Sequence, residues 1–217
     1  MRRQLLLTLA FCSMVLLSQA QWVQQATGFP NPSRGIRSIC AVDTNVVWAT
    51  AYDGVTPTNE IQEFTRTLDG GNTWVPGVIS GYTGWGLSMI CAVDGMKAWI
   101  PAWNPAGGGA ILYTSDGGTT WTPQSSATFD APAGFPNVVH FWDADSGFCM
   151  GDPNGGYFEI YTTVNGGTTW TRVPQADIPA NLASEWGVVG YYDVVGDNVW
   201  FTTGKGRVFK STDRGYH

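Results

Sequence analysis

The stretch Thr67-Leu68-Asp69-Gly70-Gly71-Asn72-Thr73-Trp74 decides the fold, because it is repeated along the chain. It returns as TSDGGTTW at Thr114–Trp121 and as TVNGGTTW at Thr163–Trp170, and a further copy begins at Ser211. The third position of each copy is acidic or an amide: Asp69, Asp116, Asn165 and Asp213. The spacings between these positions are 47, 49 and 48 residues. A regular period of this length indicates a repeat architecture.

Two further features keep the same period. The run Ile39–Asp43 (ICAVD) matches Ile90–Asp94 (ICAVD), with weaker copies at Val139–Asp143 and Gly190–Asp193. An aromatic residue then follows at a similar distance in each repeat: Trp48, Trp99, Phe148 and Trp200. Three independent features in one period leave little room for chance.

Each repeat divides into four short strands. In the second repeat we expect strands at about 87–93, 98–103, 110–114 and 120–123, separated by turn residues. Asp-Gly-Gly between two strands is a hairpin signal, since glycine accepts the positive φ that such turns need. Four strands per repeat at this period predict an all-β fold, a β-propeller of four-stranded antiparallel blades.

We expect the propeller to occupy residues 21–217, with blades at about 35–78, 86–125, 137–174 and 187–217. The fourth copy of the repeated stretch lacks its Trp, which favours part of a larger propeller. Residues 21–26 resemble the strand that follows each Trp, and we expect them to be a closing strand. The alternative is that residues 22–25 complete the fourth blade and close a four-bladed ring.

The repeated stretch has a structural chemistry. Its carboxylate or amide side chain can accept hydrogen bonds from backbone N–H groups across its own turn. Asn165 can do this as well as Asp can, which indicates a hydrogen-bonding role, and these turns lack the further oxygen ligands of a calcium loop. The following Trp is suited to filling the gap between blades. The predicted structural residues are Asp69, Trp74, Asp116, Trp121, Asn165, Trp170 and Asp213.

Residues 1–20 have the pattern of a signal peptide. Arg2 and Arg3 precede a short apolar run, and Ser18-Gln19-Ala20 predicts cleavage after Ala20. Loss of both arginines takes the net charge from −6 to −8, which argues against a nucleic-acid partner. No second apolar stretch is long enough to span a membrane, so the sequence predicts a secreted or cell-surface protein.

Three cysteines follow the predicted cleavage site: Cys40, Cys91 and Cys149. An odd number leaves at least one free thiol or an intermolecular bridge, and buried free thiols are the favoured interpretation. His140 stands alone in an apolar strand and is expected in the core. No phosphate loop, Ser/His/Asp set or metal-spaced cluster stands out, so the sequence predicts no cofactor and no metal.

The repeated stretches resemble the Asp-box, or BNR, repeat of sialidases, and we call them Asp boxes below. Similar repeats occur in sortilin-type receptors, xyloglucan-cleaving hydrolases and photosystem II assembly factors. The segment Gly151–Tyr161 is similar to secreted BNR-type proteins of undefined function. The resemblance implies a propeller fold but no particular activity, because unrelated activities share the repeat.

A sialidase would need three arginines on a carboxylate and a Tyr–Glu pair. Arg34 and Arg37 lie outside the arginine motif of that family, and Arg66 and Arg172 flank Asp boxes, so we expect no such triad. A glycosidase pair could come from two of six carboxylates, each of which has surface solvation as its simpler explanation. These are Asp53, Glu60, Asp130, Asp152, Glu159 and Glu185.

We expect any binding site on the face opposite the Asp boxes. In a four-stranded blade the long second-to-third loops and the inter-blade links share that face, and long loops on a rigid scaffold commonly carry function. We expect Trp85 and Trp186 to border the central cavity, where they would stack on a sugar, grip a peptide or only fill space. The candidate ligand-binding residues are Trp85, Trp103, Asp152, Glu185 and Trp186.

The sequence favours an exported, non-catalytic propeller that binds a glycan or a surface partner. The alternative is a glycoside hydrolase of the Asp-box type, sialidase-like or xyloglucanase-like. A third possibility is an assembly factor that holds another protein.

Overall fold

The structure is a computed structural model that describes residues 22–217. The predicted signal peptide at residues 1–20 lies outside the described residues. The fold is all-β, with four antiparallel sheets arranged as the blades of a propeller. No helix within residues 22–217 has the length and apolar character needed to cross a membrane.

Blades 1 and 2 come from the first half of the chain. Blade 1 contains β1 (Arg34–Ala41), β2 (Val47–Asp53), β3 (Glu63–Thr67) and β4 (Val75–Val78). Blade 2 contains β5 (Gly86–Leu87), β6 (Cys91–Ala92), β7 (Ala98–Trp103), β8 (Gly109–Thr114) and β9 (Thr122–Pro123). Its innermost strand is thus split into β5 and β6, which both pair with β7.

Blades 3 and 4 complete the described chain. Blade 3 contains β10 (Pro136–Phe141), β11 (Gly147–Pro153), β12 (Phe158–Thr163) and β13 (Thr171–Arg172). A short 3-10 helix, Gln175–Asp177, follows it. Blade 4 contains β14 (Gly187–Val195), β15 (Asn198–Thr203) and β16 (Val208–Ser211). Blade 4 therefore has three strands in the part of the chain that the structure describes.

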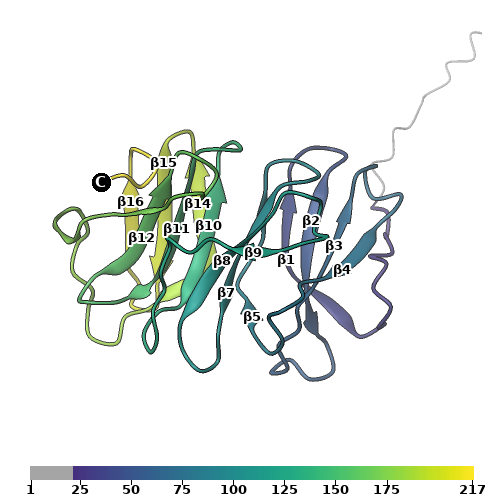
Figure 1. The fold of residues 1–217 in the computed structure, drawn as a ribbon, viewed down its shortest axis with the longest axis horizontal. Coiled ribbons are helices and arrows are strands. Elements are labelled where there is room, and N and C mark those ends of the chain that lie inside the picture. The colour runs from purple at the N-terminus through teal and green to yellow at the C-terminus, as the bar shows by residue number, and fades with distance from the viewer. Residues whose placement is uncertain (1–21) are drawn as a thin grey trace, which may run out of the picture.

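Successive blades pack side by side in chain order. In Figure 1, β1–β4 lie at one end of the molecule, while β16 and the C-terminus lie at the other. One apolar core fills the space between blades 1 and 2 and includes Trp48, Phe64 and Trp121. A larger core joins blades 2, 3 and 4 and includes Trp99 and Phe158. Burial of large aromatic rings between sheets is the main source of stability for such an arrangement.

Each Asp box closes its turn through the same hydrogen bonds. In blade 1, the hydroxyl of Thr67 donates to Asp69 Oδ1 (2.8 Å) and accepts from the Gly71 N–H (2.9 Å). The backbone N–H of Thr73 also donates to Asp69 Oδ1 (2.8 Å). Asn165 accepts the equivalent bond from the Thr169 N–H at 2.9 Å, so an amide oxygen replaces the carboxylate.

The tryptophans of the Asp boxes lie between blades. Trp121 of blade 2 packs edge-on against Phe64 of blade 1, with ring centroids 5.6 Å apart. Trp170 of blade 3 donates from Nε1 to Gln124 Oε1 of blade 2 (2.9 Å). Trp74 of blade 1 is less buried than either of these, because no blade precedes blade 1 within residues 22–217.

The Asp boxes share one face with the first-to-second turns of the blades. Gly70 N donates to Asn45 O (3.0 Å) and Gly117 N donates to Met96 O (3.0 Å), which ties each box to the turn beside it. The second-to-third loops and the inter-blade links therefore lie at the opposite ends of the strands, because the chain reverses at every turn. We call these two sides the Asp-box face and the loop face.

The predicted closing strand differs in the structure. Residues 22–26 form no strand, and they lie against blade 1 rather than completing blade 4. Gln25 Nε2 donates to Gly70 O (3.1 Å), and Trp74 Nε1 donates to Gln25 Oε1 (3.2 Å). The open edge of blade 4 is at the far end of the molecule, out of reach of this segment (Figure 1).

Candidate functional site on the loop face

An aromatic ring covers a glycine at the loop-face end of blades 1 and 2. Tyr52, the last residue but one of β2, lies opposite Gly35, and Trp103, the last residue of β7, lies opposite Gly86. A Cβ added to either glycine would lie 2.1 Å from the ring, so only glycine allows the ring to lie against the strand. The glycine at the start of β5, Gly86, is thus explained by packing under Trp103.

Blade 3 breaks this pattern with an acidic residue. Tyr52 and Trp103 each lie four residues after the aromatic of their repeat, Trp48 or Trp99. In blade 3, the residue four positions after Phe148 is Asp152. Its Oδ1 accepts from Asn137 Nδ2 (2.7 Å) and from the Gly187 N–H (2.8 Å), which links blade 3 to blade 4. Burial raises the pKa of Asp152, although these two hydrogen bonds act in the opposite direction.

A pocket of about 430 Å³ lies beside Asp152 on the loop face. Its walls come from the Trp103–Gly107 loop, the link at 132–135 and Asp152. Trp103 stacks on Phe135 in this wall, with centroids 5.2 Å apart and ring planes at 26°. The pocket therefore combines a flat apolar wall with one carboxylate, which suits a ligand with both an apolar face and hydroxyl groups.

Trp186 is not among the residues that line this pocket, but its neighbour Gly187 donates to Asp152. Its ring covers Gly204, again an aromatic over a glycine, and 49% of the side chain is exposed. Lys205 Nζ lies 6.0 Å from the ring centroid. Trp103, Asp152 and Trp186 thus form a row across blades 2, 3 and 4, and we call it the loop-face row.

The other two candidate residues have packing partners of their own. Trp85 is half-buried and contacts Tyr82 edge-on at 5.3 Å, and its carbonyl accepts from Gln62 Nε2 (2.6 Å). Glu185 is buried, with Oε1 accepting from Thr203 (2.6 Å) and facing Arg207 Nε at 3.4 Å. Burial acts to raise the pKa of Glu185, but these partners hold it below its usual value. Both residues support the loops, and neither lines the pocket.

The central cavity opens at the Asp-box end of the innermost strands. It measures about 730 Å³ and takes walls from all blades through Cys40, Cys91, His140 and Tyr192. Trp85 and Trp186, which we expected to border it, are not among its lining residues. Burial lowers the pKa of His140 to about 4, and its Nδ1 lies 3.2 Å from the Tyr192 hydroxyl.

The cysteines of the described chain are free thiols, and Cys91 and Cys149 are buried as expected. Cys40 is less buried than these two. Its sulfur accepts from the Ala92 N–H (3.2 Å), and a hydrogen bond from the Cys91 thiol lowers the pKa of Cys40 to about 7 despite burial. Within residues 22–217, no three His, Cys, Asp or Glu side chains gather closely enough to hold a metal ion.

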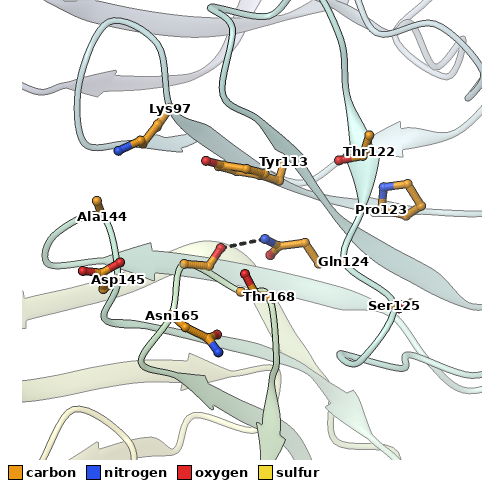
Figure 2. Close-up of a pocket in the computed structure, with 12 residues that line it drawn as sticks. Lys97, Tyr113, Thr122, Pro123, Gln124, Ser125, Ala144, Asp145, Asn165 and Thr168 are labelled. Carbon is orange, nitrogen blue, oxygen red and sulfur yellow. Dashed lines mark hydrogen bonds between the residues drawn. The ribbon is translucent and has the colours of Figure 1, made fainter.

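A second surface pocket lies on the Asp-box face, between blades 2 and 3 (Figure 2). It measures about 410 Å³ and is lined by Lys97, Tyr113 and the turn at 165–168. Figure 2 shows Gln124 reaching across it to this turn, where Nε2 donates to Gly166 O (2.7 Å). Gln124 also accepts from Trp170 Nε1 (2.9 Å), so this side chain holds blade 2 to blade 3 at the pocket.

The arginines of the described chain do not converge on one site. Arg34 pairs with Glu63 (2.8 Å), Arg37 with Glu60 (2.9 Å) and Arg214 with Asp197 (2.7 Å). The remaining arginines are also engaged with side chains or carbonyls of their surroundings: Arg66, Arg172 and Arg207. Carboxylate binding by an arginine triad has no counterpart in the described residues.

Among the candidate carboxylates, Glu159 has the most altered titration. Its side chain is 1% exposed, and Arg172 Nη1 lies 3.7 Å from Oε1. Burial raises the pKa of Glu159 to about 7, with smaller contributions from Asp130 and Asp152. Glu159 does not line the loop-face pocket, whereas Asp152 does.

Phe135, Asn137 and Asn104 were not among the predicted site residues. Phe135 stacks on Trp103, Asn137 orients Asp152, and Asn104 lies in the pocket wall. One signal in the sequence could have indicated the first two: Gly-Phe-Pro-Asn occurs at 28–31 and again at Gly134–Asn137. Asn104 has no comparable signal.

The fold and the repeated turns define the class, an Asp-box β-propeller. No protein family and no curated protein matches the sequence. Solved structures are similar: a Niastella koreensis GH74 enzyme is 19% identical with a TM-score of 0.57, over 84% of this chain and 23% of that one. A GH74 xyloglucanase from Xanthomonas campestris is 15% identical with a TM-score of 0.53, over 80% and 26%.

YCF48 from Cyanidioschyzon merolae is 20% identical with a TM-score of 0.52, over 83% of this chain and 57% of that one. This chain therefore matches part of larger propellers, about a quarter of the GH74 enzymes and just over half of YCF48. At these identities the similarity establishes the fold.

Proposed function

We propose that the protein is an exported, non-catalytic propeller that binds a glycan or a surface protein through the loop-face row. The observation that carries the proposal is Asp152, which departs from the aromatic of blades 1 and 2 at the wall of a pocket. Export is supported by the signal-peptide pattern of residues 1–20.

The geometry favours binding over hydrolysis. A glycosidase of the usual kind needs two carboxyl groups facing one bond. Asp152 is the single carboxylate among the residues that line the loop-face pocket. Its carboxylate can accept hydroxyl hydrogen bonds, while Trp103 and Trp186 offer apolar ring surface to the non-polar face of a sugar.

The alternative is a glycoside hydrolase, and one observation favours it. Asp152 and Glu159 lie in the same blade and both have raised pKa values, which is a common property of catalytic acids. Release of reducing ends from xyloglucan, lost in Asp152→Asn, would establish hydrolysis and contradict the binding proposal.

The test compares Trp186→Ala with Leu68→Ala on an array of neutral and sialylated oligosaccharides and extracellular proteins. The two side chains are similarly exposed, at 49% and 52%, but Leu68 lies on the Asp-box face. We expect Trp186→Ala and Asp152→Asn each to weaken binding at least tenfold, and Leu68→Ala to leave it unchanged. If Leu68→Ala alone loses binding, the site lies on the Asp-box face and the proposal is wrong.

A further inference from the structure

The carboxylate of Asp152 has one oxygen in use and one oxygen left for a ligand. Oδ1 accepts both hydrogen bonds that hold the side chain, from Asn137 Nδ2 (2.7 Å) and from the Gly187 N–H (2.8 Å). Within residues 22–217, no protein group donates to Oδ2. A carboxylate has about four acceptor sites on its two oxygens, so Oδ1 is filled. Because Asp152 lines the loop-face pocket, Oδ2 is the acceptor that the pocket offers.

A buried amide fixes the position of this carboxylate. Asn137 is fully buried, and its Nδ2 also donates to the backbone carbonyl of Phe135 (3.2 Å). One amide group therefore holds both Asp152 and a residue of the aromatic wall, where Phe135 stacks on Trp103. An acceptor that is held in place before a ligand arrives loses little freedom when the ligand binds. The pocket thus has a pre-positioned carboxylate beside a flat apolar wall.

The charges around the pocket favour a cation. None of the residues of the described chain that line the pocket is basic. Asp130 begins the turn that ends at Gly134 in the pocket wall, and its charge and that of Asp152 both act to raise the pKa of Glu159. Arg172 pairs with Glu159 at 3.7 Å, whereas Asp130 and Asp152 have no cationic partner within residues 22–217. A bound cation would reduce the repulsion among these carboxylates, and a neutral hydroxyl group would not.

The single free oxygen favours an ammonium group over a guanidinium group. Arginine binds a carboxylate best with its fork across both oxygens, and Oδ1 of Asp152 is already filled. A lysine ammonium is a compact charge that needs only one oxygen, while a quaternary ammonium has no N–H to donate. The apolar stem of lysine also suits the wall formed by Trp103 and Phe135, since such stems pack along apolar surface.

We propose that the loop-face pocket binds a lysine side chain of a partner protein, with the ammonium on Asp152 Oδ2 and the stem against Trp103 and Phe135. The proposal rests on the loop-face binding function above and selects a protein over a glycan as the ligand. Trp186 precedes Gly187, whose N–H holds Oδ1, and its ring is 49% exposed. This ring is therefore available to the residues that flank the lysine in the partner.

The first experiment titrates the protein with Nα-acetyl-lysine amide and follows the indole N–H signals by NMR, with the Trp103 signal assigned from Trp103→Phe. We expect a saturable shift of this signal. The norleucine amide keeps an apolar stem without the ammonium, so we expect it to bind at least about tenfold more weakly. The arginine amide should bind about threefold more weakly than the lysine amide. The proposal is wrong if the lysine amide gives no shift up to its solubility limit, or if either other amide binds as tightly.

The variant Asp152→Asn separates the free oxygen from the one that holds the side chain. Its amide oxygen can still accept from Asn137 and Gly187, while its NH2 group replaces Oδ2. We expect the lysine amide to bind this variant at least about tenfold more weakly than the parent. Asp145→Asn is the matched control and should bind as the parent does, because Asp145 lines the pocket of about 410 Å³ on the Asp-box face. Equal losses in both variants would show an effect of net charge and contradict the proposal. The comparison of amides on the parent protein does not depend on either variant.

Methyl glucoside is the neutral-sugar probe, and it distinguishes this proposal from the binding function itself. If the sugar shifts the Trp103 signal and binds as tightly as the lysine amide or more tightly, the loop face has a ligand but the choice of lysine is wrong. If binding on the array depends on Leu68 and not on Trp186, the loop-face function fails on its own test. The lysine titration would still report on the pocket in that case.

Discussion

The Asp-box face and the loop face are built in different ways. On the Asp-box face, Thr67, Thr114, Thr163 and Ser211 each accept the N–H of the glycine four positions later, at 2.8–2.9 Å. On the loop face, the links between second and third strands differ in every blade: 54–62, 104–108, 154–157 and 204–207. The repeated hydrogen bonds of the Asp-box face thus specify the fold. The loops of the loop face do not make these bonds, so their sequences can vary with the ligand.

The two faces also differ in how they treat carboxylates within blades 2 and 3. Hydrogen bonds from the Thr120 backbone and hydroxyl lower the pKa of Asp116 to about 2 on the Asp-box face. Burial raises the pKa of Glu159 to about 7, near the loop face. Charge on the box side stabilises its turn, whereas charge on Glu159 opposes folding. The stability of the protein should therefore depend on pH in opposite directions through Asp116 and Glu159.

The largest expected effect is a difference in stability between variants of two tryptophans in the same strand, β7. Trp99 is fully buried at the Asp-box end, and Trp103 is half-buried at the loop end. We expect Trp99→Ala to lower the free energy of unfolding by about 3–5 kcal/mol, since it empties the stack with Phe141. Trp103→Ala should cost about 1–2 kcal/mol, because less of its ring is removed from water.

Urea unfolding followed by tryptophan fluorescence measures both values, and the binding array supplies the second readout. We expect Trp103→Ala to lose ligand binding while it remains folded at room temperature. Equal losses of stability in the two variants, with binding unchanged in Trp103→Ala, would mean that both ends of the strand serve packing alone.

An intermediate effect is expected for Glu159→Gln. A carboxyl group whose pKa is raised on folding favours the folded state below its unfolded value, near 4.5, and loses that advantage as the pH rises through about 7. Glutamine removes the buried charge. We therefore expect Glu159→Gln to be more stable than the parent by about 2 kcal/mol at pH 8 and by less than about 1 kcal/mol at pH 5.

The matched control is Glu63→Gln, at the equivalent position of blade 1. Glu63 pairs with Arg34 at 2.8 Å and is more exposed than Glu159. The control should be no more stable than the parent at either pH, because Arg34 loses the nearer of its two carboxylate partners and keeps Asp53 at 3.4 Å. Urea midpoints at pH 5 and pH 8 measure the difference. If Glu159→Gln is destabilising at pH 8, its ion pair with Arg172 outweighs burial.

The sequence predicts the Asp-box face well because the determinants there are local. Thr67, Asp69 and Gly71 lie within one turn, so their spacing specifies their hydrogen bonds. The expected propeller and its blades follow from the same repeat, and the structure confirms the fold class. Asn165 shows that even a substitution within the box can be interpreted from hydrogen bonding alone.

The candidate site was harder to predict because its contacts join distant segments. The sequence indicates Asp152 and Trp103 by their places in long loops, but the stack of Trp103 on Phe135 joins the end of β7 in blade 2 to the link before blade 3. The contact of Asp152 with Gly187 spans 35 positions in sequence. The placement of residues 22–26 differed for a similar reason, since a strand forms only where a partner edge is within reach.

The smallest expected effect concerns the charge of one Asp box. A carboxylate whose pKa is lowered on folding stabilises the protein above its unfolded value, near 3.8, and this contribution is lost as the pH falls through about 2. Asp116→Asn gives blade 2 the amide that blade 3 already has at Asn165. We expect a slightly lower thermal midpoint at pH 7, because an amide oxygen accepts a weaker hydrogen bond than a carboxylate does.

Between pH 4 and pH 2, the thermal midpoint of Asp116→Asn should fall less steeply than that of the parent, because this turn no longer gains a proton. Asn165→Asp should behave in the opposite way and fall more steeply, which tests the same bond in the neighbouring blade. Calorimetry at closely spaced pH values measures both slopes. If both variants keep the slope of the parent, the charge of the box contributes nothing to folding. The Asp-box face would then depend on the geometry of its hydrogen bonds alone, and the electrostatic difference between the two faces would rest on Glu159.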